Sequence, residues 1–442
     1  LDKNSIVINL KIHRGTQEIG GSCIEVWTDT TQIVLDFGMP LVEKDGVEFD
    51  FRKYENLSDS ELIQKGILPD IDGLYENFEK CIDGLIITHP HLDHYGLISF
   101  LSPKVKVHLG EAAHKIIELT NIFTPSQNEI NNHQHYEKEK PFTIGDIKIT
   151  PYWMDHSAFD AYALLLESNG KTLFYSGDFR GHGRKSKVFK WFTHNAPKNV
   201  DYLLMEGTQL GRKSKIEKSE EELELELVDK FKEPEKINLI YASGQNIDRL
   251  VSVFRACVRT DKIFVVDVYV ATVLDALAKF TPTLPHPSKS FKNIKVIFSK
   301  WTSNRLAREK RESMLWKFKN YKITKEEISK NPSKFVLAVR PSMKYDLEHI
   351  PNIVGGNLIY SMWRGYEKKK GTKDFIDYLK SRNFTVNHIH SSGHADFQTL
   401  EKMVTAIAPK KLVPIHTFNS TDYKNIFNVP VKELKDGEIL SW

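Results

Sequence analysis

Cysteine is scarce in this sequence, and long hydrophobic runs and low-complexity tracts are missing from it. The 442 residues include 3 cysteines, which are far apart and form no C-x-x-C pair: Cys23, Cys81 and Cys257. An odd and dispersed set argues against a disulfide framework and favours reduced cysteines in a reducing compartment. Because no stretch reaches about 18 apolar residues and no signal-peptide pattern is present, we expect no membrane span and a cytoplasmic location.

Net charge is also small, at +4, and by itself does not identify a polyanionic partner. A chain that is 40% hydrophobic and 27% charged is not a disordered polyelectrolyte and is typical of a globular protein of about two domains. Basic residues nevertheless gather at 180–187, 212–215 and 368–370. Between residues 300 and 319 they alternate with aromatic side chains, namely Trp301, Trp316 and Phe318. Such mixtures favour single-stranded nucleic acid, although a solvated helix face with its aromatics in the core is the commoner explanation for any one stretch.

The strongest motif lies at residues 88–96, Thr-His-Pro-His-Leu-Asp-His-Tyr-Gly, directly after the apolar run 84–87. A strand points alternate residues to one side, so we expect His89, His91 and Asp93 to converge while His94, on the turn, reaches a neighbouring point. Imidazole and carboxylate groups are ligands of Zn²⁺ and Mn²⁺. This arrangement suits two metals, and a chance cluster on a solvated loop is the alternative.

Further candidates of the same residue types follow other apolar segments. Asp36 follows 33–35, His156 follows 147–153, Asp178 follows 173–176 and His416 follows 412–415. Their recurrence at the ends of predicted strands argues against a chance cluster.

In this order the residues resemble the five motifs of the metallo-β-lactamase-fold hydrolases. The resemblance implies that His89, His91 and His156 hold one metal, that Asp93, His94 and His416 hold the other, and that Asp178 bridges them. It also implies that Asp36 orients the ligands by hydrogen bonds. The expected cofactors are therefore two divalent ions, Zn²⁺ or alternatively Mn²⁺.

Asp178 and His416 lie much further apart than the closing strands of such a fold require, which indicates an insertion. Its flanks, Leu-Met-Glu206-Gly-Thr and His390-Ser-Ser392-Gly393-His394-Ala-Asp, resemble motifs A and B of the β-CASP nucleases, with His416 in the place of motif C. The resemblance implies an α/β fold, a metallo-β-lactamase αββα sandwich with an inserted β-CASP α/β domain. We expect residues 1–208 and 385–442 to form the sandwich and residues 209–384 the insertion.

Two details of this resemblance favour RNA as the substrate. DNA-directed members usually have an apolar residue at motif C, where this chain has His416. The segment around Ser392 is also similar to the one with which the ribonuclease J group holds a 5′-phosphate, which implies a phosphate pocket of His390, Ser392 and Gly393. Backbone N–H groups of a Ser-Gly loop suit this task, although an ordinary strand-to-helix turn is the alternative. Arg364 is a further candidate phosphate contact, and the helix start near Asn246 is either a phosphate site or a plain N-cap.

The resemblance implies a metal-dependent ribonuclease that cuts single-stranded RNA as a 5′ exonuclease, an endonuclease or both. Asp93, Glu206 and His394 are the candidate catalytic residues, with Glu206 polarising His394 so that the imidazole can protonate the leaving oxygen. A DNA nuclease of repair or defence, a catalytically silent RNA-processing scaffold and a small-molecule hydrolase are the alternatives. Oligomeric state and the native metal stay open.

Overall fold

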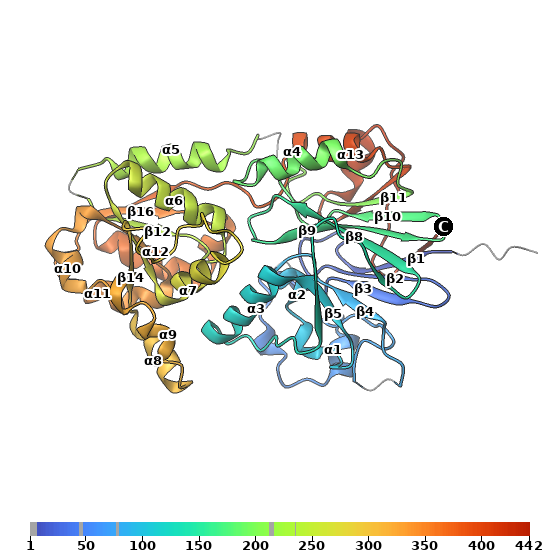
Figure 1. Ribbon diagram of the computed structural model, residues 1–442, viewed down its shortest axis with the longest axis horizontal. Helices are drawn as coiled ribbons and strands as arrows, with labels where there is room; N and C mark the ends of the chain where they lie inside the picture. Colours follow the sequence, from blue (N-terminus) through green and yellow to red (C-terminus); the bar gives the residue numbers. More distant parts are fainter. Residues whose placement is uncertain (1–6, 44–46, 77–78, 212–215, 235) are drawn as a thin grey trace, which may run out of the picture.

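The computed structural model describes residues 7–43, 47–76, 79–211, 216–234 and 236–442, and these residues form three β-sheets with flanking helices. Two of the sheets face each other and make a sandwich, and the third forms a separate unit beside it (Figure 1). The fold class predicted from the sequence, α/β with a metallo-β-lactamase sandwich, is confirmed.

The first sheet of the sandwich has seven strands in the order β19-β1-β2-β3-β4-β5-β6. Strands β1 to β3 pair antiparallel, whereas β3 to β6 pair parallel. Its strands are β1 (Asn9–Arg14), β2 (Cys23–Trp27), β3 (Gln32–Leu35), β4 (Gly84–Ile86), β5 (Val107–Gly110), β6 (His133–Tyr136) and β19 (Ile439–Ser441). Its outer face is covered by α1 (Asp59–Gln64), α2 (Leu92–Tyr95) and α3 (Glu111–Phe123).

The second sheet has six strands in the order β18-β11-β10-β9-β8-β7. They are β7 (Phe142–Ile144), β8 (Ile147–Met154), β9 (Ala161–Ser168), β10 (Lys171–Tyr175), β11 (Tyr202–Glu206) and β18 (Lys411–Ile415). The outer face of this sheet carries α4 (Ser186–Asn195) and α13 (Phe397–Ile407) (Figure 1), and α14 (Tyr423–Ile426) adds Tyr423 to the same apolar cluster. One buried apolar cluster fills the space between the two sheets and a second lies under α4 and α13. The layers are therefore α, β, β and α.

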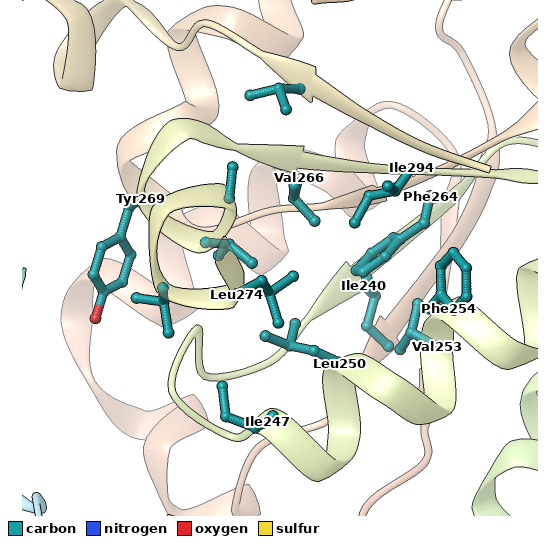
Figure 2. Close-up of a cluster of buried hydrophobic side chains, with 14 of the residues drawn as sticks. Ile240, Ile247, Leu250, Val253, Phe254, Phe264, Val266, Tyr269, Leu274 and Ile294 are labelled. Atoms are coloured by element: carbon teal, nitrogen blue, oxygen red, sulfur yellow. The ribbon is translucent and has the colours of Figure 1, made fainter. Parts of the chain in front are cut away.

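The third sheet lies within the long segment between β11 and β18, in the order β14-β13-β15-β12-β16-β17, and all its pairs are parallel. Its strands are β12 (Asn238–Tyr241), β13 (Ile263–Asp267), β14 (Ile294–Ile297), β15 (Phe335–Ala338), β16 (Gly356–Tyr360) and β17 (Phe384–His388). Its helices are α5 (Glu220–Phe231), α6 (Ile247–Arg259), α7 (Val268–Leu277), α8 (Lys300–Arg308), α9 (Ser313–Trp316), α10 (Lys325–Lys330), α11 (Lys344–Glu348) and α12 (Lys370–Ser381). Figure 2 shows the core of this unit, where Leu250 and Val253 of α6 and Leu274 of α7 lie against Ile240 and Phe264.

The boundaries at residues 208 and 384 stay predictions, and the last strand of the third sheet runs past residue 384. The third unit is tied to the sandwich through α3, because Gln245 Nε2 donates to Thr120 Oγ1 (2.8 Å) and the Arg305 guanidinium donates to the carbonyls of Ile122 and Thr124 (2.7 Å each). Packing of this kind places the edge of the inserted unit next to the strand ends of the sandwich.

Two smaller expectations concern cysteines and membranes. All three cysteines are free; Cys23 and Cys257 are buried, and Cys81 is half-buried. Among the described residues, no helix combines the length and the apolar character that a membrane crossing requires.

Candidate metal centre

The predicted ligands gather where strands of the two facing sheets end. Asp36 follows β3, His156 follows β8, Asp178 follows β10 after two residues, and His416 follows β18. The expected strand geometry at His89–Asp93 is wrong, because β4 ends at Ile86 and α2 begins at Leu92, so Asp93 lies on a helix. The helical turn brings Asp93 and His94 together with Asp178 and His416, whereas His89 and His91 gather with His156, so the candidate ligands form two adjacent groups.

The first group consists of His89, His91 and His156. His91 Nδ1 lies 3.2 Å from His89 Nε2 and 3.2 Å from His156 Nε2. Two nitrogens bound to one Zn²⁺ at about 2.0–2.1 Å in tetrahedral geometry lie about 3.3 Å apart. The three rings are therefore already arranged as ligands of a single ion.

The second group consists of Asp93, His94, Asp178 and His416, whose ligand atoms lie within 4.8 Å of one another. His94 Nε2 is 3.2 Å from Asp178 Oδ2, and His416 Nε2 is 3.4 Å from Asp93 Oδ2. Both Asp178 oxygens and His94 Nε2 are buried without a hydrogen-bond partner among the described residues. Because buried polar atoms that make no hydrogen bond are costly, this donor set fits a divalent cation. Asp178 Oδ2 also lies 3.7 Å from His89 Nε2, so this carboxylate stands between the two groups.

Asp36 holds the ligands in place from behind. Its fully buried carboxylate accepts hydrogen bonds from the Thr88 N–H (2.8 Å), the Thr88 hydroxyl (2.9 Å) and the Tyr175 hydroxyl (2.9 Å). It also lies 2.8 Å from His94 Nδ1, which fixes the tautomer that presents Nε2 to a metal. The geometry matches the orienting part that the sequence resemblance implies.

Unusual backbone geometry places two of these residues. Asp36 (φ 57) and His416 (φ 52) both adopt the left-handed region, which few non-glycine residues occupy. The His416 N–H donates to the Gly15 carbonyl at 2.6 Å, which holds this conformation. Gly38 allows the backbone after β3 to pack closely against the backbone of α2, because a Cβ at Gly38 would lie 1.8 Å from the Asp93 carbonyl oxygen. Backbone strain is thus present at two of the strand ends that carry candidate ligands.

The ligand rings differ in proton affinity. Burial and the neighbouring imidazoles lower the pKa of His89 and His156 well below the usual value, and burial lowers the pKa of His91 to about 4. These rings are neutral at pH 7 and offer lone pairs. Burial also lowers the pKa of His94, but Asp178 and Asp36 raise it by more, so metal binding at His94 must release a proton.

Glu206 and His394 meet beside the two ligand groups. His394 Nδ1 lies 3.1 Å from Glu206 Oε2 and 3.7 Å from Asp178 Oδ2. Burial lowers the pKa of His394, but Glu206 and then Asp178 outweigh it and raise the pKa to about 9. The Glu206 carboxylate is fixed by backbone N–H groups of Phe179 (3.1 Å), Thr208 (3.3 Å) and Ala395 (3.4 Å). His394 is therefore a protonated imidazole at the edge of the candidate metal centre.

The residues of the predicted phosphate pocket already have hydrogen-bond partners or close neighbours. Gly393 packs against the first group, since a Cβ there would lie 3.4 Å from His156 Cε1. The Ser392 N–H donates to the Glu217 carboxylate at 3.2 Å, and His390 Nδ1 lies 3.3 Å from the Ser361 carbonyl oxygen. Arg364 opens the 3₁₀ helix η6 (Arg364–Lys368), where it is exposed and lies 3.7 Å from Glu367. The structure therefore places His390, Ser392 and Gly393 on one loop beside the first ligand group and leaves Arg364 at the surface.

Sequence reasoning missed a buried charge network beneath this loop. Arg180 is fully buried, pairs with Asp155 (3.4 Å) and Asp248, and donates to the Ser392 carbonyl (3.0 Å). Arg249 pairs with Glu220 (2.9 Å) and donates to the Ser361 carbonyl (3.3 Å) and hydroxyl. The network joins the sandwich to the inserted unit. The partners of each arginine lie far away in the sequence, so no local pattern could have identified this network.

The basic stretches give mixed outcomes. Arg180 is structural, so the interpretation of 180–187 as a nucleic-acid surface is wrong for that residue, and Phe318 is buried in the core. Residues 212–215 lie outside the described residues. Asn246 is a plain N-cap, since its side chain accepts from the Arg249 N–H at 3.1 Å. Trp301 and Trp316 remain exposed.

Other groups near the ligands also escaped the sequence analysis. Thr208 Oγ1 lies 2.9 Å from His416 Nδ1 and orients that ring. Burial, with the Asp93 charge next, raises the pKa of Tyr366 in η6.

Comparison with known families agrees with this geometry. Residues 76–238 match the family described as "Beta-lactamase superfamily domain", and residues 373–419 match the "Zn-dependent metallo-hydrolase RNA specificity domain". The chain is 24% identical over 416 residues to ribonuclease J of Helicobacter pylori; the alignment covers 91% of this chain and 55% of that protein. It is 26% identical over 239 residues to an RNase J-like protein of Methanocaldococcus jannaschii, covering 51% of this chain and 48% of the other. The chain thus spans about half the length of these curated relatives.

A solved structure supports the fold. A protein of unknown function from Enterococcus faecalis V583 is 21% identical, with a TM-score of 0.78 over 99% of this chain and 100% of that one. The whole arrangement of sandwich and inserted unit is therefore shared with an independent protein.

Proposed function

We propose that this chain, which belongs to the metallo-β-lactamase-fold nucleases of the β-CASP type, hydrolyses phosphodiester bonds of single-stranded RNA with two divalent metal ions. One observation carries the proposal. Asp178, a member of the second ligand group, lies 3.7 Å from His89 of the first group, and a protonated imidazole, His394, stands 3.7 Å from the same carboxylate. Hydrolysis of a phosphodiester needs an activated water on one side and a proton for the leaving oxygen on the other, and this site holds groups for both.

The ligand side of the reaction follows from the two groups. His89, His91 and His156 would hold one ion, and Asp93, His94 and His416 would hold the other, with the Asp178 carboxylate available to both. When bound, divalent ions lower the pKa of water and neutralise charge on the attacked phosphate. Zn²⁺ suits the imidazole-rich set, and Mn²⁺ is also compatible with the carboxylates.

The leaving-group side belongs to His394. Glu206 keeps the ring protonated at neutral pH, so the imidazolium can donate its Nε2 proton to the departing oxygen. The N–H donors around Glu206 keep its charge directed at His394. Asp93, Glu206 and His394 are thus the proposed catalytic residues, Asp93 as a metal ligand and Glu206 as the group that positions and charges His394.

RNA is the proposed substrate because the chain matches an RNA specificity domain at residues 373–419, which include His394 and His416, and because its full-length relatives are ribonucleases. Single-stranded substrate is supported by Phe418, which is 58% exposed two residues after His416 and can stack on a base. A base stack of this kind contributes about 1–3 kcal/mol, so we expect Phe418→Ala to weaken RNA binding by roughly 5-fold to 160-fold.

His390, Ser392 and Gly393 are proposed to face a substrate phosphate, with Arg364 reaching it from η6. The Glu217 carboxylate now accepts from the Ser392 N–H, and a phosphate at this N–H must displace it. Like charges repel, so Glu217 should weaken selection of a 5′-monophosphate. Internal cleavage is therefore the favoured mode, and 5′ exonuclease action requires Glu217 to move away.

The proposal is tested with the purified chain, loaded with Zn²⁺ or Mn²⁺, on matched single-stranded RNA and DNA that carry either a 5′-monophosphate or a 5′-hydroxyl. Metal-dependent cleavage of RNA, abolished by a chelator and by His89→Ala/Asp93→Ala, is the expected result. His349→Ala/Asp374→Ala, which changes the same residue types at exposed positions, is the matched control and should cleave like the wild type.

The products separate the alternatives. Internal cuts independent of the 5′ end indicate an endonuclease, and mononucleotides released only from 5′-phosphorylated RNA indicate an exonuclease. Faster cleavage of DNA would overturn the substrate, and no metal-dependent cleavage would overturn the proposed activity.

A further inference from the structure

A second group of histidines lies at the edge of the first sheet, and the proposed reaction does not use it. His133 and His135 are both on β6, the edge strand that pairs parallel with β5, and His114 is near the start of α3. Alternate residues of a strand point to the same side, so both β6 rings face in one direction. The chain runs from β5 directly into α3, which brings His114 over the same face.

The three rings are close enough to share a ligand. His114 Nδ1 lies 3.0 Å from His135 Nε2, and one nitrogen of each ring lies within 4.8 Å of the others. Ring centroids are 4.3 Å apart for His114 and His133, 4.9 Å for His133 and His135, and 5.3 Å for His114 and His135. In the group of His89, His91 and His156 the corresponding distances are 4.8, 5.0 and 4.8 Å.

A single hydrogen bond between His114 and His135 explains only one of these contacts. It does not account for the third ring, His133, whose centroid lies closer to that of His114 than the centroid of His135 does. His114 is buried at the base of the group, whereas His133 and His135 are exposed. Exposed imidazoles rotate freely, so both can close to the spacing of about 3.3 Å that a shared Zn²⁺ requires, while His114 stays fixed on its helix.

We propose that His114, His133 and His135 form a further metal site, separate from the candidate metal centre, which binds one Zn²⁺ or a similar transition-metal ion. Three imidazoles without a carboxylate among the ligands favour Zn²⁺, Co²⁺, Ni²⁺ or Cu²⁺ over Mg²⁺, Ca²⁺ or Mn²⁺. Water completes the coordination, since the β6 side is open to solvent.

The ion links an edge strand to a helix. Among the described strands, β6 pairs with β5 alone, and the C-terminal part of α3 contacts the inserted unit through Thr120, Ile122 and Thr124. An ion bound by both β6 and α3 therefore stabilises the edge strand and the helix that contacts the inserted unit. The part that the ion plays is structural.

Metal stoichiometry tests the proposal. The full chain, without an affinity tag, is stripped of metal and dialysed against a fixed free Zn²⁺ concentration, and bound Zn²⁺ is measured by mass spectrometry. We expect the wild type to hold one more ion per chain than His133→Ala/His135→Ala. The matched control His194→Ala/His349→Ala, which removes two exposed histidines elsewhere, should bind as much as the wild type.

Two further measurements guard against a folding defect. The Co²⁺-loaded wild type minus the Co²⁺-loaded His133→Ala/His135→Ala variant should give the visible bands of a low-symmetry, four-coordinate ion, while far-ultraviolet dichroism stays unchanged. The single exposed change His133→Asn should weaken Zn²⁺ binding at this site by about 10-fold or more. Equal Zn²⁺ content in the wild type and the double variant, or a featureless Co²⁺ difference, would overturn the site.

Discussion

Replacing Glu206 with glutamine removes the charge that keeps His394 protonated while conserving the size of the side chain. The wild-type pKa of His394 is raised to about 9 from an ordinary value of 6.5, and Glu206 is the strongest of the groups that raise it. This displacement corresponds to about 3 kcal/mol in favour of the protonated ring. A general acid works below its pKa and fails as pH rises through it, so the variant should lose activity mainly at high pH.

The expected loss has a pH dependence that can be calculated. If the pKa of His394 returned fully to 6.5, the protonated fraction would fall about 30-fold at pH 8 but only about 1.3-fold at pH 6. Asp178 and Asp93 also raise the pKa, so these are upper limits. Single-turnover cleavage of a labelled RNA, measured from pH 6 to 9.5, should show the alkaline limb of the Glu206→Gln profile at lower pH than that of the wild type.

Controls separate this effect from a structural one. The Glu206 carboxylate also accepts hydrogen bonds from three backbone N–H groups. Because the amide of a glutamine has one oxygen in place of two, Glu206→Gln should lower the free energy of unfolding by about 1–3 kcal/mol, which thermal unfolding measures. Glu206→Asp keeps the charge and should keep the alkaline limb, and Glu401→Gln, an exposed carboxylate on α13, should match the wild type. The same fold loss at pH 6 and pH 8 would refute the reasoning.

Further predictions concern the groups around the site. Asp36→Asn should weaken metal binding by about 10-fold to 100-fold in a competition with a coloured chelator, and unchanged affinity would contradict the orienting part of Asp36. Arg249→Met leaves the buried Glu220 charge without its strongest partner and should lower the free energy of unfolding in urea by about 3–5 kcal/mol. The double variant Arg249→Met/Glu220→Gln should regain part of that loss, and a single variant as stable as the wild type refutes this prediction. Burial raises the pKa of Glu220, but Arg249 and Arg180 outweigh it and lower the pKa to about 2. The stability that this carboxylate contributes is therefore present above pH 4.5 and is lost as pH falls through 2. The free energy of unfolding of Glu220→Gln should depend less steeply on pH in this range, and a slope identical to that of the wild type counts against the reasoning. Glu217→Gln should raise the rate on 5′-monophosphate RNA relative to 5′-hydroxyl RNA, and an unchanged ratio would exclude Glu217 from the pocket.

The clustering of the candidate ligands could be predicted because coordination chemistry depends on residue type and because apolar runs mark the strands that these residues follow. The assignment of 89–93 to a strand failed at Asp93, since the short helix α2 begins at Leu92. Alternation along a strand would have placed Asp93 with His89 and His91, and the helical turn instead places it with His94 and His416. Four residues of helix are too few for hydrophobic periodicity to detect.

Charge patterns were the least reliable guide. Arg180 was interpreted as part of a basic surface, yet it is fully buried against Asp155 and Asp248, which lie 25 and 68 positions away. Whether a basic residue faces solvent or a buried carboxylate depends on long-range packing. The same holds for Glu217, whose contact with Ser392 joins positions 175 residues apart.

The sequence by itself determined the inventory of this protein: the histidines and aspartates at strand ends, the Glu206 and His394 segments, and the long insertion between Asp178 and His416. Those features are local in the chain, and residue type and neighbouring hydrophobicity suffice to recognise them. Only the tertiary structure decided how closely the atoms of each proposed ligand group approach one another, that Glu206 raises the pKa of His394, and that His114 meets His133 and His135. Each of these depends on distances and burial between residues remote in sequence, and electrostatic energy follows distance and dielectric surroundings rather than position along the chain.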